Sequence, residues 1–504
     1  MSYLTNLKAA TNYGYTENGA VVHKSTGSKL LDLFGLGGAY RGKSDEDCIV
    51  LFKQAYAENP LYALKCLFYL RDVRGGQGER RFFRVCINWL AKNYPEIVKN
   101  NLENIPYYGR WDDLYSLIDT PIEKDMFAFI RKQLNLDIES KTPSLLGKWL
   151  KSENTSSAES RYLAHLTRIA LGANHKQYRK MLSVLRERIN IVERLMSQNK
   201  WDEIEFDKIP SRAGLIYKNA FARRDIIKEK YQTFAKDTTT KVNAEVLNPV
   251  DIAEKIFKYS CWNTPDANST ERLMLQKYWD NLKDYYNGRE ENGLAIVDTS
   301  GSMNGQPLAA AVSMGAYIAE RGKGPFANHF ITFSVKPELV EFDGVDITDK
   351  FLRAKSANWD MNTNMEAVFD LLLNTAIKNN TNPKDMPETL YIFSDMQFDR
   401  CMTTGKKIET SYFWWAGDEY EKITEPETFF ETIAKKWASY GYELPRIIFW
   451  NLRASKNNIP ALGNRFSYVS GFNMNMVEQI LSGEDGYSLM IKKLDTERYN
   501  RVSL

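Results

Sequence analysis

The chain has 504 residues, of which 43% are hydrophobic and 26% charged, and its formal net charge is +3 at pH 7. This length is enough for two or three domains, and the composition is that of a folded globular protein rather than a disordered one. No run of about 18 apolar residues is present, and residues 1–8 lack the apolar core of a secretory signal. We therefore expect neither a membrane span nor a signal peptide.

The cysteines are odd in number and widely spaced: Cys48, Cys66, Cys86, Cys261 and Cys401. They form neither a zinc-ligand pattern nor a disulfide framework, and the histidines do not pair at ligand spacing. We expect buried free thiols in a reducing, cytoplasmic environment, and no transition-metal site.

The near-neutral net charge of the whole chain conceals a basic stretch. Residues 141–243 carry roughly 21 lysines and arginines against roughly 11 aspartates and glutamates, an excess of about ten positive charges. One interpretation is a functional surface that attracts polyanions such as RNA. The other is a set of solvated helix faces whose charges point in many directions. The first interpretation gives these candidate RNA-binding residues: Lys148, Lys151, Arg179, Lys180 and Arg186.

Residues 43–200 have the periodicity of amphipathic helices, because apolar residues recur at three- and four-residue spacing. Short breakers such as Asn59-Pro60 separate the runs. Helix pairs on short loops without a strict sequence period predict degenerate, HEAT-like repeats. Helices are expected again at residues 250–262 and 271–286. We place an all-α domain at residues 1–288, in which 201–288 is a possible connecting or inserted segment.

Two loops of this half combine arginine with glycine or aromatic residues. Residues 71–81 read Arg-Asp-Val-Arg-Gly-Gly-Gln-Gly-Glu-Arg-Arg, and arginines can hold phosphate bidentately. The glycines match no phosphate-loop template, so an inter-helix loop with internal ion pairs is an equal alternative. In residues 106–114, aromatic residues flank Arg110; they can stack on unpaired bases, but core anchors are the favoured interpretation. The candidate RNA contacts are Arg71, Arg74, Arg80, Arg81 and Arg110.

After residue 288 strands and helices alternate, which predicts a βαβ domain over residues 289–485, followed by a short tail, 486–504. Strands are expected at 294–297, 329–333, 390–393, 446–451 and 466–469. Helices are expected at 308–320, 365–378, 426–440 and 474–481. The polar, aromatic-rich segment 403–427 is expected to form an insertion.

Polar oxygens follow two of the predicted strands. Asp298, Ser300 and Ser302 come directly after the first strand, Asp395 ends a later one, and Thr363 lies in a loop before a helix. In an open parallel sheet, ligands bind where the strands end. Hard oxygen ligands suit Mg²⁺, whereas the plainer interpretation is that Asp298 and its neighbours cap the next helix.

This order of residues resembles the metal-ion-dependent adhesion site (MIDAS) of von Willebrand factor A domains. The resemblance implies that Ser300, Ser302 and Thr363 bind a divalent cation directly, and that Asp298 and Asp395 act mainly through bound water. The expected cation is Mg²⁺, or another divalent ion such as Mn²⁺ or Ca²⁺.

Together with the motif at residues 71–80, the chain resembles the Ro autoantigen family, most closely an uncharacterised Ro-like group in which Phe393-Ser394-Asp395-Met396 is typical. The resemblance implies an N-terminal all-α TROVE module of HEAT-like repeats and a C-terminal α/β A domain, Rossmann-like with a mainly parallel sheet. In that family the helical ring takes single-stranded RNA ends, and structured small RNAs bind its outer surface.

The leading hypothesis is therefore an RNA-binding, non-catalytic ribonucleoprotein component with a magnesium-binding A domain. The alternative is a metal-dependent adhesion or scaffold protein without RNA, in which an Asp or Glu of a protein partner completes the metal shell. A hydrolase is disfavoured because no histidine lies near Asp298 or Ser300 in the sequence, and their oxygens suit a hard cation better than nucleophilic attack.

Overall fold

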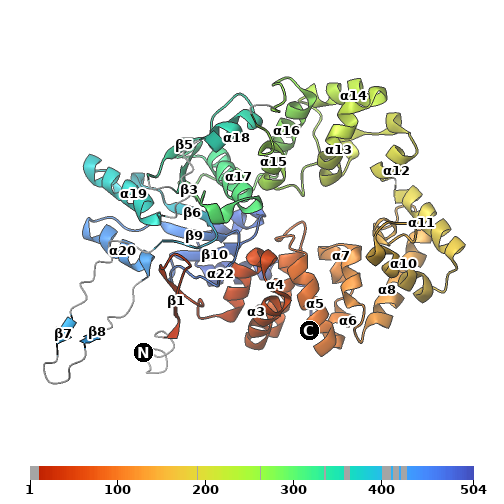
Figure 1. Cartoon of the computed structure of the whole chain (residues 1–504), viewed down its shortest axis with the longest axis horizontal. Coiled ribbons are helices and arrows are strands. Elements are labelled where there is room, and N and C mark those ends of the chain that lie inside the picture. The colour runs from red at the N-terminus through yellow and green to blue at the C-terminus, as the bar shows by residue number, and fades with distance from the viewer. Residues whose placement is uncertain are drawn as a thin grey trace.

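The computed structural model describes residues 11–189, 191–260, 263–333, 336–356, 364–399, 410–412, 419–421 and 428–504. A mainly helical N-terminal half is followed by an α/β domain with a mostly parallel sheet (Figure 1), which confirms the predicted fold class. None of the helices in these ranges is long and apolar enough to cross a membrane.

The first described elements form a hairpin that was not predicted, β1 (Tyr13–Tyr15) and β2 (Val21–His23). Serine and asparagine caps start several of the helices after it; the Asn59 side chain, for example, accepts from the backbone nitrogen of Tyr62, with Pro60 at the first helical position. The helices of this half are α2 (Lys29–Leu36), α3 (Asp45–Glu58), α4 (Pro60–Arg71), α5 (Arg81–Asn93), α6 (Pro95–Asn100), α7 (Asn104–Tyr108), α8 (Glu123–Glu139), α9 (Leu146–Trp149), α10 (Ala158–Ala170), α11 (His175–Ile189), α12 (Val192–Ser197), α13 (Ser211–Arg223), α14 (Asp225–Lys236), α15 (Pro249–Ile256) and α16 (Thr270–Asp280).

The α/β domain is built on a six-stranded sheet of order β10-β9-β6-β3-β4-β5. Its strands are β3 (Gly293–Val297), β4 (His329–Thr332), β5 (Leu339–Glu341), β6 (Thr389–Ser394), β9 (Arg446–Asn451) and β10 (Phe466–Ser470). The five predicted strands are present and parallel; β5 is an additional, antiparallel edge strand. A separate two-stranded hairpin, β7 (Thr410–Tyr412) and β8 (Glu419–Glu421), lies within the predicted insertion.

The α-helices among the described residues of this half are α17 (Gln306–Arg321), α18 (Ile347–Ser356), α19 (Met365–Asn379), α20 (Phe429–Ser439), α21 (Val477–Ile480) and α22 (Gly486–Leu494). Helix α17 packs directly on β3. Gly315 makes this approach possible, because a Cβ at this position would lie 2.5 Å from Cγ2 of Val297.

The helical half is an arch whose two ends both rest on the α/β domain (Figure 1). At the first end α2 packs on β10, and a Cβ on Gly35 would lie 2.8 Å from Cβ of Tyr468. At the second end α15 packs on α17 and α16 on α18. There Arg272 holds Asp346 with two hydrogen bonds, of 2.6 and 2.8 Å. The chain therefore forms a closed circuit.

The C-terminal residues 486–504, predicted as a tail, are part of the first contact. Helix α22 packs on α2, α4 and β10. In the turn after it, Arg498 donates to both carboxylate oxygens of Asp72 (2.5 and 2.7 Å), and the Tyr499 hydroxyl donates to the same side chain (3.0 Å). Asp72 is fully buried, so the end of the chain fastens the loop after α4.

Replacing Asp72 with alanine should therefore destabilise the protein severely. The change leaves Arg498 and the Tyr499 hydroxyl without their acceptor, and removing one partner of a buried ion pair costs about 3–5 kcal/mol. Denaturant unfolding of the full chain measures the loss. The matched control is Asp45→Ala, which breaks the exposed Arg81–Asp45 pair and should cost less than about 1 kcal/mol. Equal losses would contradict the assigned role of Asp72.

Candidate metal centre and nucleic-acid interface

Asp298 and Asp395 lie at the carboxyl ends of two adjacent parallel strands. β3 and β6 pair in register from Gly293–Thr389 to Val297–Phe393, so the two strands end at the same level. From β3 the sheet continues in one direction through β4 and in the other through β6, β9 and β10. This is the topological switch point of the sheet, where open α/β folds bind their ligands.

Short hydrogen bonds connect the polar groups of this edge. Oδ1 of Asp298 accepts from the backbone nitrogen of Ser300 (2.9 Å), and Oδ2 accepts from the Ser394 hydroxyl (2.5 Å). The hydroxyls of Ser300 and Ser302 lie 3.0 Å apart. Oδ1 of Asp395 accepts from the backbone nitrogen of Gln397 (3.1 Å). We call this group the metal edge.

The two carboxylates of the metal edge are buried, at 0% and 1% exposure. Burial, reinforced by the charge of Asp395, raises the pKa of Asp298 to about 6. Burial also raises the pKa of Asp395, against the lowering effects of the Ser302 hydrogen bond and the Arg453 charge. Within the described residues neither carboxylate forms an ion pair. Buried charges without counter-ions are costly, so a cation held by these oxygens would be favoured.

The backbone after β6 has a conformation that is unusual outside glycine. Met396 has φ +61°, in the left-handed region that non-glycine residues adopt at a cost. The Ser394 hydroxyl accepts from its nitrogen (3.0 Å), and Asn458 donates to its carbonyl (3.1 Å). These bonds hold Asp395 against β3, and strain of this kind is typical of binding sites.

Four of the five predicted metal residues, Asp298, Ser300, Ser302 and Asp395, thus lie together, while Thr363 is outside the described residues. The donors are carboxylate and hydroxyl oxygens, which fit Mg²⁺. In the ranges that the structure describes, no group of three or more His, Cys, Asp or Glu side chains could hold a metal, so a cation at this edge would depend on the serine hydroxyls.

The arginine–glycine loop after α4 packs against both the helical half and the α/β domain. Arg71 is 2% exposed and pairs with the buried Asp113 (2.7 Å). Gly76 lies so close to Tyr69 that a Cβ would come within 1.8 Å of its carbonyl oxygen. Asn475 of the α/β domain donates to the Gly76 carbonyl (2.9 Å). Arg71 has no surface left for a ligand, so its interpretation as an RNA contact is wrong.

The other arginines of this loop differ in their surroundings. Arg81 pairs with Asp45, whereas the side chains of Arg74 and Arg80 are exposed. The latter two remain open to a ligand.

Most of the basic residues between positions 106 and 186 that were predicted to contact RNA hold helices together. Arg110 bonds to Asp112 (2.9 Å) and lies over the Trp149 ring, 4.1 Å from its centroid. Arg186 donates to the carbonyls of Gly147 and Leu150 and to the Ser152 hydroxyl. The remaining residues sort as follows: Lys151 pairs with Asp112, Lys148 pairs with Glu193, and Arg179 and Lys180 are exposed on α11.

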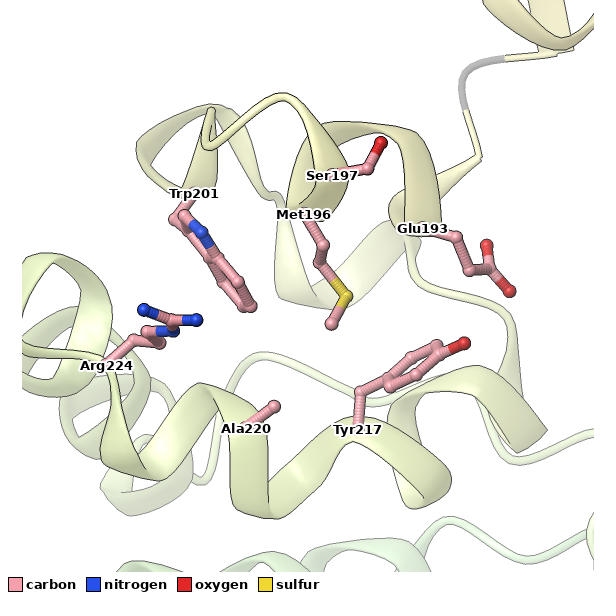
Figure 2. A pocket seen from close by; sticks show the side chains of 7 residues that line it. All are labelled: Glu193, Met196, Ser197, Trp201, Tyr217, Ala220 and Arg224. Atoms are coloured by element: carbon pink, nitrogen blue, oxygen red, sulfur yellow. The ribbon is translucent and has the colours of Figure 1, made fainter.

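Two adjoining cavities lie between α11 and α13. The first, of about 480 Å³, has three arginines in its wall, Arg179, Arg186 and Arg194. The second, of about 410 Å³, is lined by the side chains of Met196, Trp201, Tyr217, Ala220 and Arg224, shown in Figure 2. Both are bordered by Glu193 and Ser197. We call them the arginine cavity and the aromatic cavity.

Sequence reasoning missed the aromatic cavity. Trp201, Tyr217 and Arg224 belong to the segment that was taken as a possible connection, and they come from separate elements. The only signal was that aromatic and basic residues alternate between residues 194 and 224.

The chain matches known families over both halves. Residues 16–165 and 147–286 match the "Domain of unknown function (DUF2828)", and residues 292–500 match the "Domain of unknown function (DUF7788)". The chain belongs to the DUF2828 family. It is 30% identical over 522 residues to "Uncharacterized protein L728" of Acanthamoeba polyphaga mimivirus, covering 94% of this chain and 85% of the viral protein.

Among solved structures, the crystal structure of the Deinococcus radiodurans RO (RSR) protein is similar over 93% of this chain and 99% of its own, with 13% identity and a TM-score of 0.45. The matching family models are those of domains of unknown function, so membership of the Ro family itself stays a prediction.

Replacing Asp298 with asparagine should stabilise the metal-free DUF2828 protein at pH 7. The amide keeps an acceptor for Ser300 and removes a buried charge that has no counter-ion in the described residues, worth about 1–3 kcal/mol. Denaturant unfolding in EDTA measures this gain, and added MgCl₂ should stabilise only the wild type. Asp370→Asn, which breaks the half-buried pair with Lys436, is the control. A variant less stable than wild type in EDTA would show that the Asp298 charge is already compensated.

Proposed function

We propose that this protein binds single-stranded RNA at the arginine and aromatic cavities of its arch, as a non-catalytic component of a ribonucleoprotein. The observation that carries the proposal is the junction of the two cavities at Glu193 and Ser197. Guanidinium groups hold phosphates and aromatic rings stack on unpaired bases. In a nucleotide one sugar joins the phosphate to the base, so a binding site needs guanidinium groups and aromatic rings close together. The adjoining cavities offer both.

The charges around the cavities support this assignment. The acidic residues in the cavity walls are already paired: Glu153 with Arg168 and His175, and Glu193 with Lys148. Several exposed basic residues of α11 and α14 have no carboxylate partner among the described residues, namely Lys176, Arg179, Lys180, Lys228 and Lys236. The surplus positive charge would attract a polyanion.

The α/β domain would hold the arch closed and bind a divalent cation, Mg²⁺ or an ion such as Mn²⁺ or Ca²⁺. Ser300, Ser302 and Thr363 would be its direct ligands, with Asp298 and Asp395 acting through water. The buried free thiols of Cys48, Cys66 and Cys86 support a cytoplasmic location. We propose no catalytic role for the metal residues or the thiols.

A second candidate function is metal-dependent capture of a protein through one of its carboxylates. The convergence of two buried carboxylates and two hydroxyls at the metal edge favours it. In this case Asp298→Ala would abolish capture of the partner and leave RNA affinity unchanged. Capture that survives both this change and EDTA would exclude a metal-mediated contact.

Reversing two charges beside the arginine cavity should weaken RNA binding. The double variant Arg179→Glu, Lys180→Glu removes two exposed cations, so affinity for a single-stranded RNA should fall about ten-fold or more. The slope of log affinity against log salt should become shallower by about 1.4, at about 0.7 for each lost phosphate contact. Fluorescence anisotropy at several salt concentrations measures both quantities. Lys378→Glu, Lys384→Glu changes the charge of the α/β domain equally and should leave affinity nearly unaffected. An equal loss in both variants would indicate only a long-range effect of net charge.

Removing the Tyr217 ring should weaken RNA binding without altering its salt dependence. Stacking contributes about 1–3 kcal/mol for each base, so Tyr217→Ala should lower affinity about five- to hundred-fold. Anisotropy titrations of the same oligonucleotide measure the change. Tyr162→Ala removes a ring that is 53% exposed on α10 and should have no effect. If Tyr217→Ala binds as wild type does, bases do not stack in the aromatic cavity.

A further inference from the structure

The side chain of Glu193 lies at the boundary between the arginine cavity and the aromatic cavity, and it lines both. Its Oε1 accepts a hydrogen bond from the Lys148 ammonium (3.3 Å). Its Oε2 is buried and accepts no hydrogen bond from the described part of the chain. A buried acceptor without a donor is unfavourable, so a ligand that brings a donor to this oxygen would be bound more tightly.

The two ends of the aromatic cavity differ in charge. Figure 2 shows Glu193 and the Tyr217 hydroxyl at one end, Trp201 and Arg224 at the other, and Met196 between them. Burial raises the pKa of Tyr217, and the neighbouring charge of Glu193 raises it further, as expected for two groups at the same end. A flat ring that stacks on Tyr217 would therefore direct one of its edges at a carboxylate.

The bases of single-stranded RNA differ in what their free Watson–Crick edges present to such a group. Guanine presents two adjacent donors, N1–H and the 2-amino group. Adenine and cytosine each place an amino donor beside a ring nitrogen that accepts, and uracil places one N–H between two carbonyls. An ionised carboxylate only accepts, and each of its oxygens can accept more than one hydrogen bond. The Glu193 carboxylate can therefore satisfy both guanine donors while Oε1 keeps Lys148.

We propose that Glu193 makes the aromatic cavity selective for guanine, by accepting hydrogen bonds from N1–H and the 2-amino group of one unpaired base. The proposal rests on RNA binding at the two cavities, proposed above. Lys148 offsets the charge of the carboxylate, so an anionic RNA strand can approach it. Because Glu193 also borders the arginine cavity, the phosphate next to the base would lie among arginines. The arginines would position the backbone, and Glu193 would distinguish the bases.

Base preference of the full-length protein tests this. Fluorescence anisotropy measures its affinity for short oligouridines that carry guanine, hypoxanthine, adenine or uracil at one central position. A bidentate contact to a base discriminates strongly, so wild type should bind the guanine RNA about ten-fold more tightly than the adenine and uracil RNAs. Hypoxanthine keeps N1–H and lacks the 2-amino group, so its RNA should bind with intermediate affinity. Glu193→Gln offers one acceptor and one donor, and should bind the guanine and adenine RNAs equally.

The matched control is Lys148→Gln, which breaks the same ion pair and leaves the carboxylate in place. It should keep the preference for guanine, whereas a purely structural role of the pair would make the two variants behave alike. Equal binding of all four RNAs by wild type, or a guanine preference that persists in Glu193→Gln, would overturn the role of Glu193 while RNA binding stands. Absence of binding to every RNA by wild type would overturn RNA binding and this proposal together.

Discussion

The closed circuit of this protein depends on one buried carboxylate, Asp72. It lies in the loop after α4 and accepts hydrogen bonds from Arg498 and Tyr499, at the opposite end of the sequence. Asp72 is 0% exposed, so its charge is tolerated only because these donors are in place. The same loop receives Asn475 of the α/β domain. Helical half, sheet domain and C-terminus therefore meet at one ion pair.

This constraint explains why the motif that looked most like a ligand loop is structural. An arginine–glycine run can be read from local sequence, but the partners of its side chains cannot. Arg71 is paired with Asp113, which is 42 positions further along the chain, and Asp72 with a residue 426 positions away. The glycines serve close packing, as the contact of Gly76 with Tyr69 shows. Composition alone does not distinguish a loop that serves packing from a loop that binds phosphate.

The metal edge was predictable because its information is local and because parallel strands end at one edge of a sheet. Asp298 and Asp395 each follow an apolar strand directly, and the register of β3 with β6 then brings them together. Helix ends were less predictable. A helix was expected over residues 271–286, but α16 ends at Asp280; the apolar Tyr285 and Tyr286 that extended the pattern are buried beyond its end.

Short elements and long-range contacts could not be predicted from the sequence. The strands of the N-terminal hairpin have three residues each, too few for a period to be recognised, and the partners of its turn are some 380 positions away. The aromatic cavity was missed for a similar reason, since its walls come from α12, α13 and the 3₁₀ helix Trp201–Glu203.

The segment after β9 joins the metal edge to the first end of the arch. On one side Arg453 donates to the carbonyl of Ser302 (2.6 Å). On the other, the nitrogen of Ala454 donates to Ala39 (3.1 Å), and the Tyr40 hydroxyl donates to Asn457 (2.5 Å). Hydrogen bonds of this segment thus connect Ser302 with the 3₁₀ helix Gly37–Gly42. The arginine and aromatic cavities lie between α11 and α13, half-way round the circuit (Figure 1). The metal edge and the two cavities are therefore separate sites, which is why loss of the cation at Asp298 is expected to leave RNA affinity unchanged.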